Sequence, residues 1–378
     1  MRITLVIAGL TGGGAERTCV NLANAWVARG HQVTILTISY GSAPSAYDID
    51  ARVNRRDVGW PRQVRPEELN AREMSPVLRG LHSAGCMVMI EQLGIIAMIR
   101  HKILATSPDV VVPIIDLTNI RVLAAMSETK VRIIACEQTD SERISMGRLQ
   151  HVRDGLYRRA YAVVAPHSKI VEWFRKRGAN AVSIPNPLVA PKTLEFRQTC
   201  ERRRLVTLTR LSEEKRPALM IRAFARIAAE HPEWDLEIFG DGHLRDGLLR
   251  LVDEIAPGRV FLRGFVRDTD AILGAADLFV SASWVEGFGN AIWEALASGL
   301  PVVAMDAGPP IRSLVRHGID GLIVDTNSVE ALASALGSLM GDDEMRKTFA
   351  ERAPEVLVRF PIEAALEAWD ELLDGVTA

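Results

Sequence analysis

Runs of branched apolar residues alternate with amphipathic segments along the whole chain. The first run, RITLVIAGL, leads through three glycines into a segment where Ala15, Cys19, Leu22 and Trp26 recur at helical spacing. Gly30 follows this segment, and glycine is common just past the end of a helix. The start of the chain is therefore predicted to form a strand, a helix and a second strand, QVTILTIS.

The same alternation continues to the end of the chain. Further strands are predicted at PDVVVPII, VRIIACE and YAVVAP, and then at RLVTLTRL, DLEIFGDG, RVFLRGF, DLFVSAS, PVVAMDAG and GLIVD. Strands that are apolar throughout and alternate with helical segments are typical of parallel sheets covered on both faces. The pattern predicts an α/β protein with two doubly wound, Rossmann-like domains.

A segment rich in proline and then in charge, PNPLVAPKTLEFRQTCERRR, indicates a linker with a hinge near residues 186–204. We place an N-terminal domain at residues 1–188 and a C-terminal domain at residues 189–360. Residues 361–378 are predicted to form a separate amphipathic helix, whose docking site the sequence does not give. Since ligands bind at the carboxyl ends of strands in such sheets, we expect the two domains to face a central cleft.

Composition limits the class of protein. The 378 residues are 48% hydrophobic and 24% charged, which is ordinary for a globular protein of two domains. The sequence contains no run of about 18 apolar residues, and its start lacks the pattern of a signal peptide. The cysteines are far apart, which indicates neither a zinc site nor a disulfide framework and fits a cytoplasmic location; they are Cys19, Cys86, Cys136 and Cys200.

Charge is divided unevenly between the two halves. Residues 1–185 carry 24 Lys and Arg against 16 Asp and Glu, whereas residues 186–378 carry 21 against 31. Two basic stretches of the first half, RVNRRDVGWPRQVR and RISMGRLQHVRDGLYRR, also contain Trp60 and Tyr157. Such mixtures favour an anionic membrane surface, with solvated loops as the other interpretation. Nucleic acid would fit the charge alone, but no nucleic-acid motif supports it.

Three consecutive glycines, Gly12, Gly13 and Gly14, follow the first predicted strand. Backbone amides in such a loop can approach a phosphate closely, although a plain strand-to-helix turn is the alternative. The dinucleotide fingerprint fails because Arg17 stands where its third glycine is required, and the second strand ends in Tyr40 instead of an acid. An NAD dehydrogenase is therefore disfavoured, and the P-loop pattern is absent as well.

Three motifs of the second half also follow predicted strands. In TLTRLSEEKRP, Arg210 and Lys215 can reach one anion if the loop turns between them. In FGDGHLRDGL and RGFV, glycines and main-chain groups could lie against a flat base; the candidates there are Gly240, Gly242, Arg263, Gly264 and Phe265. Charged loops and glycine turns are common, so each motif alone is ambiguous.

The stretch WVEGFGNAIWEALASGLPVVA contains two glutamates eight residues apart. Glu286 is predicted in a strand-to-helix loop whose amides favour negative charge, so we interpret its carboxylate as an acceptor for sugar hydroxyls. Glu294 is predicted about one turn into an apolar helix, where a ribose diol could satisfy it. Either acid alone could be an ordinary helix residue. The same loop supplies backbone groups from Gly287, Phe288, Gly289 and Asn290.

Together, these motifs resemble the retaining glycosyltransferases of family GT4, which have the GT-B fold. The pair Glu286 and Glu294 matches the specific part of the family pattern, and GGGAER, TRLSEEKRP, FGDGHLRDGL and GLIVD extend the match across nearly the whole chain. The resemblance implies that Arg210 and Lys215 hold the diphosphate of a nucleotide-sugar. It also implies that Glu286 contacts the sugar, that Glu294 holds the ribose, and that residues 12–14 close over the phosphates.

The chain departs from the family at one position. Many members have a histidine in the loop that follows the strand VRIIAC, but this chain has Glu137 and Gln138 there. A catalytic histidine therefore cannot be carried over. Family members that act on lipid-linked oligosaccharides also have an acid in this loop, so Glu137 and Gln138 are candidates, with a strand-end cap as the alternative for Glu137.

The sequence predicts a metal-independent, retaining glycosyltransferase that moves a sugar from a UDP-sugar to a glycan acceptor, linked to polyprenyl diphosphate, in surface polysaccharide or glycan biosynthesis. Neither a cofactor nor a metal is expected, because Arg, Lys and amide donors can stabilise the leaving diphosphate. We expect a cytoplasmic protein that is peripheral at the inner face of the cell membrane. Two alternatives stay open: a GT-B sugar-nucleotide epimerase or hydrolase, and a sugar-nucleotide-binding protein without catalysis.

Overall fold

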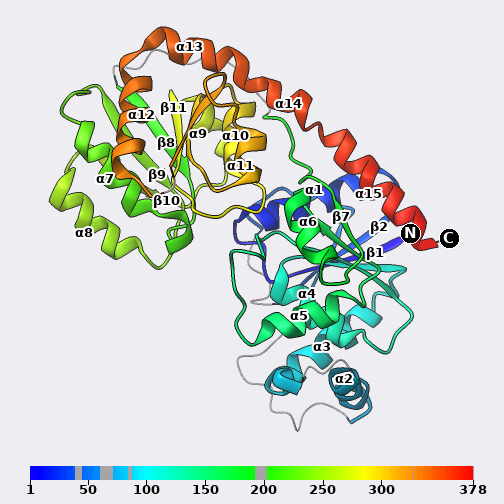
Figure 1. The fold of residues 1–378 in the computed structure, drawn as a ribbon. Helices are drawn as coiled ribbons and strands as arrows, with labels where there is room; N and C mark the ends of the chain where they lie inside the picture. The colour runs from blue at the N-terminus through cyan, green and yellow to red at the C-terminus, as the bar shows by residue number, and fades with distance from the viewer. Residues whose placement is uncertain (39–44, 60–70, 84–86, 192–201, 326, 378) are drawn as a thin grey trace. The chain divides into compact units, whose positions relative to one another are not determined.

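A computed structural model of the protein describes residues 1–38, 45–59, 71–83, 87–191, 202–325 and 327–377. The chain forms two compact units: unit 1 consists of Met1–Pro187 and Glu363–Ala378, and unit 2 consists of Leu188–Ile362 (Figure 1). The sequence placed this division one residue later, between residues 188 and 189, and assigned residues 361–378 to neither domain.

Unit 1 is built on a sheet of seven strands in the order β3-β2-β1-β4-β5-β6-β7, and all the paired strands are parallel. β4 and β6 are buried along their whole length, as their apolar sequences VVVP and AVVA require. The strands are β1 (Arg2–Ile7), β2 (Gln32–Thr37), β3 (Asn54–Asp57), β4 (Val110–Pro113), β5 (Arg132–Cys136), β6 (Ala162–Ala165) and β7 (Ala181–Ser183).

Helices connect these strands and cover the sheet. The helix predicted after the glycine loop is present, with Cys19, Leu22 and Trp26 on its buried face. The helices of unit 1 are α1 (Gly14–Ala28), α2 (Ala71–Ser83), the 3-10 helix η2 (Met87–Gln92), α3 (Leu93–Leu104), α4 (Asp116–Ala125), α5 (Leu149–Tyr157), α6 (Ser168–Arg175) and α15 (Ile362–Thr377). Among the described residues, no helix is both long and apolar enough to cross a bilayer.

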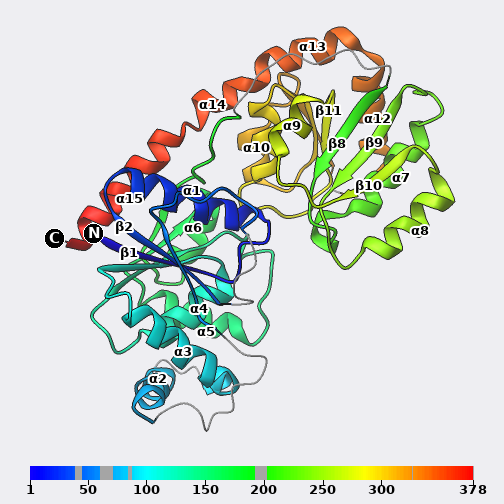
Figure 2. The same ribbon diagram turned by 180° about the vertical axis from the view of Figure 1, so that it is seen from behind.

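The C-terminal helix α15 belongs to unit 1, where it lies beside α1 in both views (Figure 1, Figure 2). The rings of Trp26 on α1 and Trp369 on α15 meet edge to face, with their centroids 5.5 Å apart. Both side chains are almost fully buried. The structure therefore gives the docking site that the sequence could not, and shows the predicted separate segment to be part of the N-terminal core.

Unit 2 repeats the architecture with six strands in the order β10-β9-β8-β11-β12-β13, again paired in parallel. The strands are β8 (Arg203–Leu208), β9 (Trp234–Phe239), β10 (Val260–Gly264), β11 (Leu278–Ser281), β12 (Val302–Met305) and β13 (Gly321–Val324). Apolar clusters pack on the sheet from α7, α8 and α12 and from α10, α11 and α14. The helices are η3 (Glu213–Lys215), α7 (Pro217–Ile227), α8 (Arg245–Ile255), α9 (Thr269–Gly274), α10 (Asn290–Ala297), α11 (Pro309–Leu314), α12 (Val329–Gly341), α13 (Asp343–Arg352), η4 (Ala353–Glu355) and α14 (Val356–Arg359).

The strand order reverses beside the first strand of each sheet. In unit 1 the reversal lies between β1 and β4, and in unit 2 it lies between β8 and β11. Ligands of doubly wound proteins bind at such points, outside the carboxyl ends of the strands. The prediction of two doubly wound α/β domains is confirmed. The strand order of each sheet indicates that a site should lie at the carboxyl ends of the strands beside the reversal.

Candidate functional site

Two predicted motifs meet at the strand-order reversal of unit 2. Lys215 lies in the loop after β8, and Glu286 lies in the loop after β11. The Nζ atom of Lys215 is 2.6 Å from Oε1 of Glu286. The two loops are also joined through the backbone, because the Trp284 amide donates to the Glu214 carbonyl over 3.2 Å. The structure thus brings together the pair that the sequence placed 71 residues apart.

The local backbone fixes the position of Lys215. It is the last residue of η3, and Arg216 then adopts the left-handed conformation with φ 50° before Pro217 begins α7. The side chains of Lys215 and Glu286 are 25% and 14% exposed, so their ion pair is largely shielded from water. A diphosphate that binds here would have to share the ammonium group with the Glu286 carboxylate.

Arg210 lies on the same loop, two residues after the end of β8. Its side chain is exposed, and its guanidinium has no hydrogen bond or ion pair with any described residue. The structure does not place this guanidinium on the Lys215–Glu286 pair. The predicted joint clamp of Arg210 and Lys215 therefore stays a prediction.

The N-terminus of α10 lies beside the same pair. Gly289 precedes the helix with φ 101°, and a Cβ there would also lie 3.1 Å from Cδ1 of Leu314. The Ile292 amide in the first turn already donates to the Gly289 carbonyl over 3.0 Å, but the dipole of the helix still makes this end favourable for negative charge. Asn290 and Glu294 are one turn apart and half-buried, whereas the neighbouring residues Ile292, Trp293 and Ala295 are buried. Glu294 therefore shares the face of Asn290 and does not point into the apolar face.

The other residues of this loop are buried. Phe288 is 4% exposed, and its ring packs edge to face on Phe360 with the centroids 5.7 Å apart. Gly287 is buried as well. The Phe288 side chain is therefore part of the core of unit 2, and the backbone contacts that the sequence assigned to Gly287 and Phe288 stay a prediction.

Gly240 and Gly242 have a structural explanation. A Cβ on Gly240 would overlap the carbonyl oxygen of Thr209, and a Cβ on Gly242 would overlap the carbonyl oxygen of Leu211. The Leu211 amide donates to the Asp241 carbonyl over 2.9 Å, so the two loops lie directly against each other. These glycines are required by that packing, and the contact with a flat base stays a prediction.

The residues of the RGFV segment differ in whether their side chains are accessible to a ligand. The Arg263 guanidinium is bound to the Glu237 carboxylate, with Nε 2.8 Å from Oε1. Gly264 has φ 78°, and its carbonyl accepts from the Gly240 amide over 2.8 Å. Phe265 is 46% exposed. Arg263 is therefore engaged on the sheet, whereas the Phe265 ring is accessible.

The glycine loop of unit 1 follows β1 at the strand-order reversal. The Gly12 amide donates to Oε2 of Glu16 over 2.6 Å, and the Gly13 amide donates to the Tyr47 hydroxyl over 2.9 Å. Gly14 begins α1. A carboxylate thus already accepts from an amide at which the sequence predicted a phosphate, and a phosphate would have to displace Glu16.

Glu137 and Gln138 follow β5, next to the strand-order reversal of unit 1. Glu137 is fully buried, and its carboxylate accepts hydrogen bonds from the Tyr157 hydroxyl and from the Gln138 and Thr139 amides. The side-chain amide of Gln138 exchanges two hydrogen bonds with Asn186, each 3.0 Å long. Burial raises the pKa of Glu137 to about 7, with a further contribution from the charge of Asp116.

Sequence patterns did not indicate two features of this region. Ile115 has φ 75° although it is β-branched, which is a strained conformation. It places Asp116 at the start of α4, close enough for its charge to act on Glu137. The partners of Glu137 come from other elements, so no local pattern could have identified them; only an acid at a strand end was visible in the sequence.

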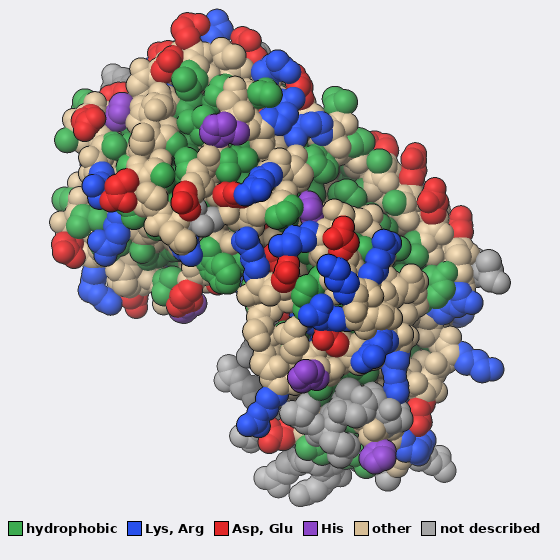
Figure 3. All heavy atoms as spheres, viewed as in Figure 1, with side chains coloured by type: hydrophobic (Ala, Val, Ile, Leu, Met, Phe, Trp, Pro, Cys, Tyr) green, Lys and Arg blue, Asp and Glu red, His purple; other side chains and the backbone are tan. Residues whose placement is uncertain are grey.

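The basic stretch at residues 143–159 is only partly a surface patch. Tyr157 and Arg153 are buried, which corrects the interpretation of this stretch as an aromatic and basic membrane surface. Arg143, Arg148 and Arg158 are exposed. In Figure 3, Lys and Arg side chains gather over the part of unit 1 that α5 and α6 cover. The other stretch includes Trp60, which lies outside the described residues.

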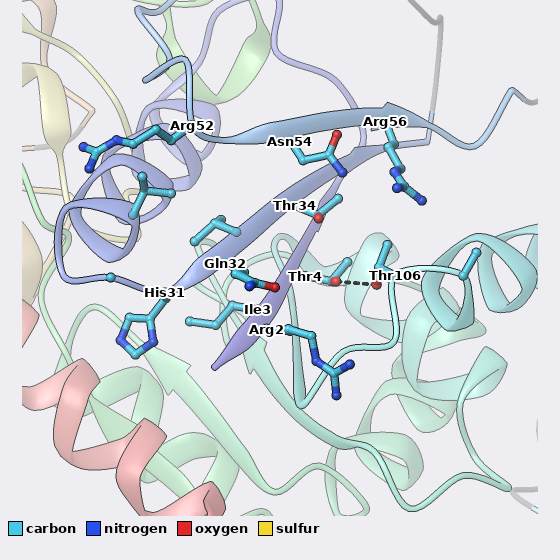
Figure 4. Close-up of a pocket in the computed structure, with 14 residues that line it drawn as sticks. Arg2, Ile3, Thr4, His31, Gln32, Thr34, Arg52, Asn54, Arg56 and Thr106 are labelled. Atoms are coloured by element: carbon cyan, nitrogen blue, oxygen red, sulfur yellow. Dashed lines mark hydrogen bonds between the residues drawn. The ribbon is translucent and has the colours of Figure 1, made fainter.

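A cavity of 550 Å³ lies at the opposite edge of the unit 1 sheet (Figure 4). Residues near the amino ends of β1, β2 and β3 line it, including Thr4 and Thr34. Three arginines, Arg2, Arg52 and Arg56, line it, and two of them are in ion pairs, Arg2 with Asp109 at 2.8 Å and Arg52 with Asp50 at 2.7 Å. The candidate residues of unit 1 lie on loops at the carboxyl ends of the strands, so this cavity is not part of their site.

Within the described part of the chain, no three His, Cys, Asp or Glu side chains are grouped so that they could hold a metal ion. The buried cysteines Cys19 and Cys136 are free thiols. Cys86 and Cys200 lie outside the described residues.

Comparisons with known proteins match both units. A family model described as "Glycosyl transferase 4-like domain" matches residues 13–187, and one described as "Glycosyl transferases group 1" matches residues 196–356. An exopolysaccharide phosphotransferase of Streptomyces coelicolor is 27% identical over 98% of this chain. The matched part of this chain spans less than half the length of several curated relatives, and 40% of that one.

One relative is similar over its whole length. It is the alpha-1,4-N-acetyl-D-galactosaminyltransferase of Campylobacter jejuni that is named for a GalNAc-GalNAc-diNAcBac-PP-undecaprenol substrate, and it is 25% identical over 100% of this chain and 99% of its own. Among solved structures, HepE of Anabaena in complex with UDP-glucose has a TM-score of 0.75 and 20% identity, covering 99% of this chain and 100% of that one. The two family models together span both units, and the chain therefore belongs to the GT4-like glycosyltransferases of the GT-B fold.

Proposed function

We propose that the protein moves a sugar from a UDP-sugar to a glycan acceptor linked to polyprenyl diphosphate, in the biosynthesis of a surface polysaccharide or glycan. The proposed reaction retains the anomeric configuration and needs no metal ion. The observation that carries the proposal is the contact of Lys215 with Glu286 at the strand-order reversal of unit 2, beside the N-terminus of α10.

The chemistry of this site suits a departing diphosphate. In the transfer, the bond between the anomeric carbon and the phosphate oxygen breaks, the acceptor oxygen bonds to that carbon, and the hydroxyl proton leaves with the diphosphate. Negative charge therefore grows on the phosphate oxygens. A cation and helix amides that are already in place stabilise this charge more in the transition state than in the ground state. Lys215, Arg210 and the first-turn amides of α10 would supply these groups.

The donor and the acceptor are proposed on separate grounds. The UDP-glucose complex of HepE supports a UDP-sugar, because that protein shares the fold. The PP-undecaprenol substrate named for the Campylobacter relative supports a lipid-linked glycan acceptor. We assign the donor to the strand-end loops of unit 2 and the acceptor to those of unit 1.

The central test replaces the cation that would balance the leaving diphosphate. Lys215→Ala should lower kcat by about 100-fold to 1,000-fold while the dissociation constant for UDP changes only a few-fold, since the charge develops in the transition state. Turnover would be followed with a UDP-sugar panel and a lipid-linked acceptor extract, and UDP binding by calorimetry. A raised KM with an unchanged kcat would contradict the role of Lys215.

Arg226→Ala is the matched control for this experiment. Arg226 is also a cation of unit 2 with a carboxylate partner, 2.7 Å from Glu330, but it is on the exposed surface of α7. Its replacement should leave both constants unchanged. Donor consumption without any acceptor, at the rate seen with acceptor, would identify a hydrolase or epimerase instead of a transferase.

A further inference from the structure

The strongest unexplained feature of unit 1 is the set of hydrogen bonds around Glu137. The Gln138 and Thr139 amides donate to its Oε1 atom over 2.9 and 3.1 Å. The Tyr157 hydroxyl donates to its Oε2 atom over 2.9 Å. The side chain has no exposed surface, so these three groups replace water as its partners.

The direction of these hydrogen bonds is fixed by a backbone carbonyl. The Asn119 side-chain nitrogen donates to the Cys136 carbonyl over 3.1 Å, and a carbonyl oxygen can only accept. The same nitrogen is 2.9 Å from the Tyr157 hydroxyl and donates to it as well. The proton of Tyr157 must therefore point to Glu137. All three partners of the Glu137 carboxyl group are donors, and a proton on Oε2 would face another donor.

The loop held by this carboxylate reaches the end of unit 1. Gln138 and Thr139 form the loop after β5, on the edge of the sheet at which doubly wound proteins bind ligands. The side-chain amide of Gln138 exchanges two hydrogen bonds with Asn186, which directly precedes Pro187, the last residue of this part of unit 1. The carboxylate thus anchors a loop at the ligand edge of the sheet and, through Gln138, the segment that leads out of the unit.

We infer that Glu137 is a positioning residue: its ionised carboxylate holds the Gln138–Thr139 loop in the shape that receives the acceptor, and protonation of Glu137 releases that loop. The inference rests on the proposed function only for the identity of the molecule that the loop receives. The release itself is a property of unit 1 and can be observed without any substrate.

Neighbouring charges place this protonation near neutral pH. Burial and the Asp116 charge on α4 raise the pKa of Glu137, while the Arg153 charge on α5 and the hydrogen bonds from Tyr157 and the Gln138 amide lower it, with a result of about 7. Burial raises the pKa of the Cys136 thiol to about 12, and the pKa of Tyr157 is raised as well, so both stay neutral. Glu137 is therefore the group of this cluster that changes charge between pH 6 and pH 8.

The first measurement uses the protein without substrate. The backbone amide resonances of Gln138 and Thr139 in NMR spectra should move together between pH 6 and pH 8, with one midpoint near 7. In Glu137→Gln they should be independent of pH in this range. Resonances of the wild type that do not titrate would overturn the inference, whatever the enzyme catalyses.

The second measurement is the acceptor KM as a function of pH. Since the fraction of ionised Glu137 falls about tenfold from pH 8 to pH 6, the acceptor KM of the wild type should rise about tenfold. Glu137→Gln should show, at both pH values, a KM at least as high as that of the wild type at pH 6. Its side-chain NH2 would meet the Tyr157 hydroxyl donor to donor, which turns the side chain and moves its remaining oxygen away from the Gln138 and Thr139 amides. The UDP dissociation constant should be unaffected. An acceptor KM of Glu137→Gln that follows pH like the wild type would refute the positioning role.

Two further variants keep the test decisive. Tyr157→Phe keeps the ring but removes a hydrogen bond to the ionised carboxylate, so the midpoint of the Gln138 and Thr139 resonances should move to higher pH even if Glu137→Gln does not fold. Glu172→Gln, which removes an exposed acid on α6, should behave as the wild type. Titration of the amides without sugar transfer by any variant would reject the proposed function and retain the positioning role.

Discussion

The burial of Glu137 lowers the stability of the folded chain when its carboxyl group is ionised, which its position at a strand end does not reveal. A carboxyl group whose pKa rises on folding, here from 4.5 to about 7, binds more protons in the folded than in the unfolded chain. Its contribution to the free energy of unfolding therefore falls as pH rises through this window. The ionised form is favoured by its local hydrogen bonds but disfavoured by its burial, which suits a group that is to be released by a proton.

Because this contribution falls as pH rises, replacement of Glu137 should change how stability depends on pH. The free energy of unfolding of Glu137→Gln, relative to that of the wild type, should increase by about 2 kcal/mol from pH 5 to pH 8. The wild type loses stability over this range because Glu137 ionises more readily in the unfolded chain than in the folded one, and the variant has no carboxyl group there. Urea denaturation at both pH values measures the change. Glu172→Gln is the control, and a stability difference between Glu137→Gln and wild type that is constant with pH would contradict the prediction.

Glu294 leads to a prediction of a different kind. Glu294→Ala should weaken UDP binding by about 1–3 kcal/mol, since the carboxylate would accept two ribose hydroxyls at the half-buried face of α10. Titration calorimetry with UDP measures this change. Glu254→Ala, on the exposed surface of α8, should leave the affinity unchanged. Equal affinities of the two variants would remove Glu294 from the ribose.

At the residue scale, local patterns found the candidates but not their partners. Lys215 and Glu286 were predicted separately, each from the glycines and charges around it, and the fold brings their charged groups into contact. Glu137 was visible only as an acid at a strand end. Its partner Tyr157 lies at the end of helix α5 and appeared in the sequence as part of a basic surface patch. Contacts between distant segments depend on strand order, which the hydrophobic pattern does not specify.

At the scale of elements, buried strands were predictable and exposed ones were not. The apolar runs at β4 and β6 are buried on both faces, so their sequences alone identify them. β3 has the sequence NRRD and is largely exposed at the edge of the sheet. Charged edge strands discourage pairing with other chains, but their polar residues resemble a loop.

The turns after β8 and β9 depend on glycine for their close approach. Gly242→Ala should destabilise unit 2 by roughly 1–3 kcal/mol or more, because its Cβ would overlap the Leu211 carbonyl and force the loops apart. Thermal unfolding measures this loss. Gly247→Ala is the matched control: a Cβ at this position in α8 would make only an ordinary contact, 3.9 Å from Nη2 of Arg250, and alanine is favoured over glycine in helices by about 1 kcal/mol. Equal effects of the two substitutions would contradict the steric explanation.

At the scale of the whole molecule, the core of unit 1 contains a residue from the far end of the chain. Trp369→Ala should cost about 3–5 kcal/mol of stability in unit 1, since it removes a buried ring from its contact with Trp26. Hydrogen exchange should show faster opening in β1 and β4 with unchanged protection in β8 and β11. Glu367→Ala, on the exposed face of α15, should have no such effect. A uniform loss of protection in both units would argue against the assignment of α15 to unit 1.

For the stretch at residues 143–159, the membrane hypothesis now depends on exposed arginines, because Tyr157 is buried. Replacement of Arg148 and Arg158 by glutamine should lower binding to anionic vesicles by about 30-fold, because each of the two basic residues near such a surface contributes about 1 kcal/mol. Flotation with anionic and with neutral liposomes measures the difference. Arg226→Gln in unit 2 is the control. Equal, negligible binding of the wild type to both kinds of liposome would exclude a membrane-surface role.

The route of the chain also sets an order of events during synthesis. All of unit 2 is synthesised after the sheet of unit 1 and before α15. Trp26 therefore lacks its partner Trp369 until unit 2 has been made. Unit 2 is continuous and can fold as soon as it is complete. Unit 1 is begun first and finished last, and a nascent chain that stalls before residue 363 would expose an apolar surface that chaperones recognise.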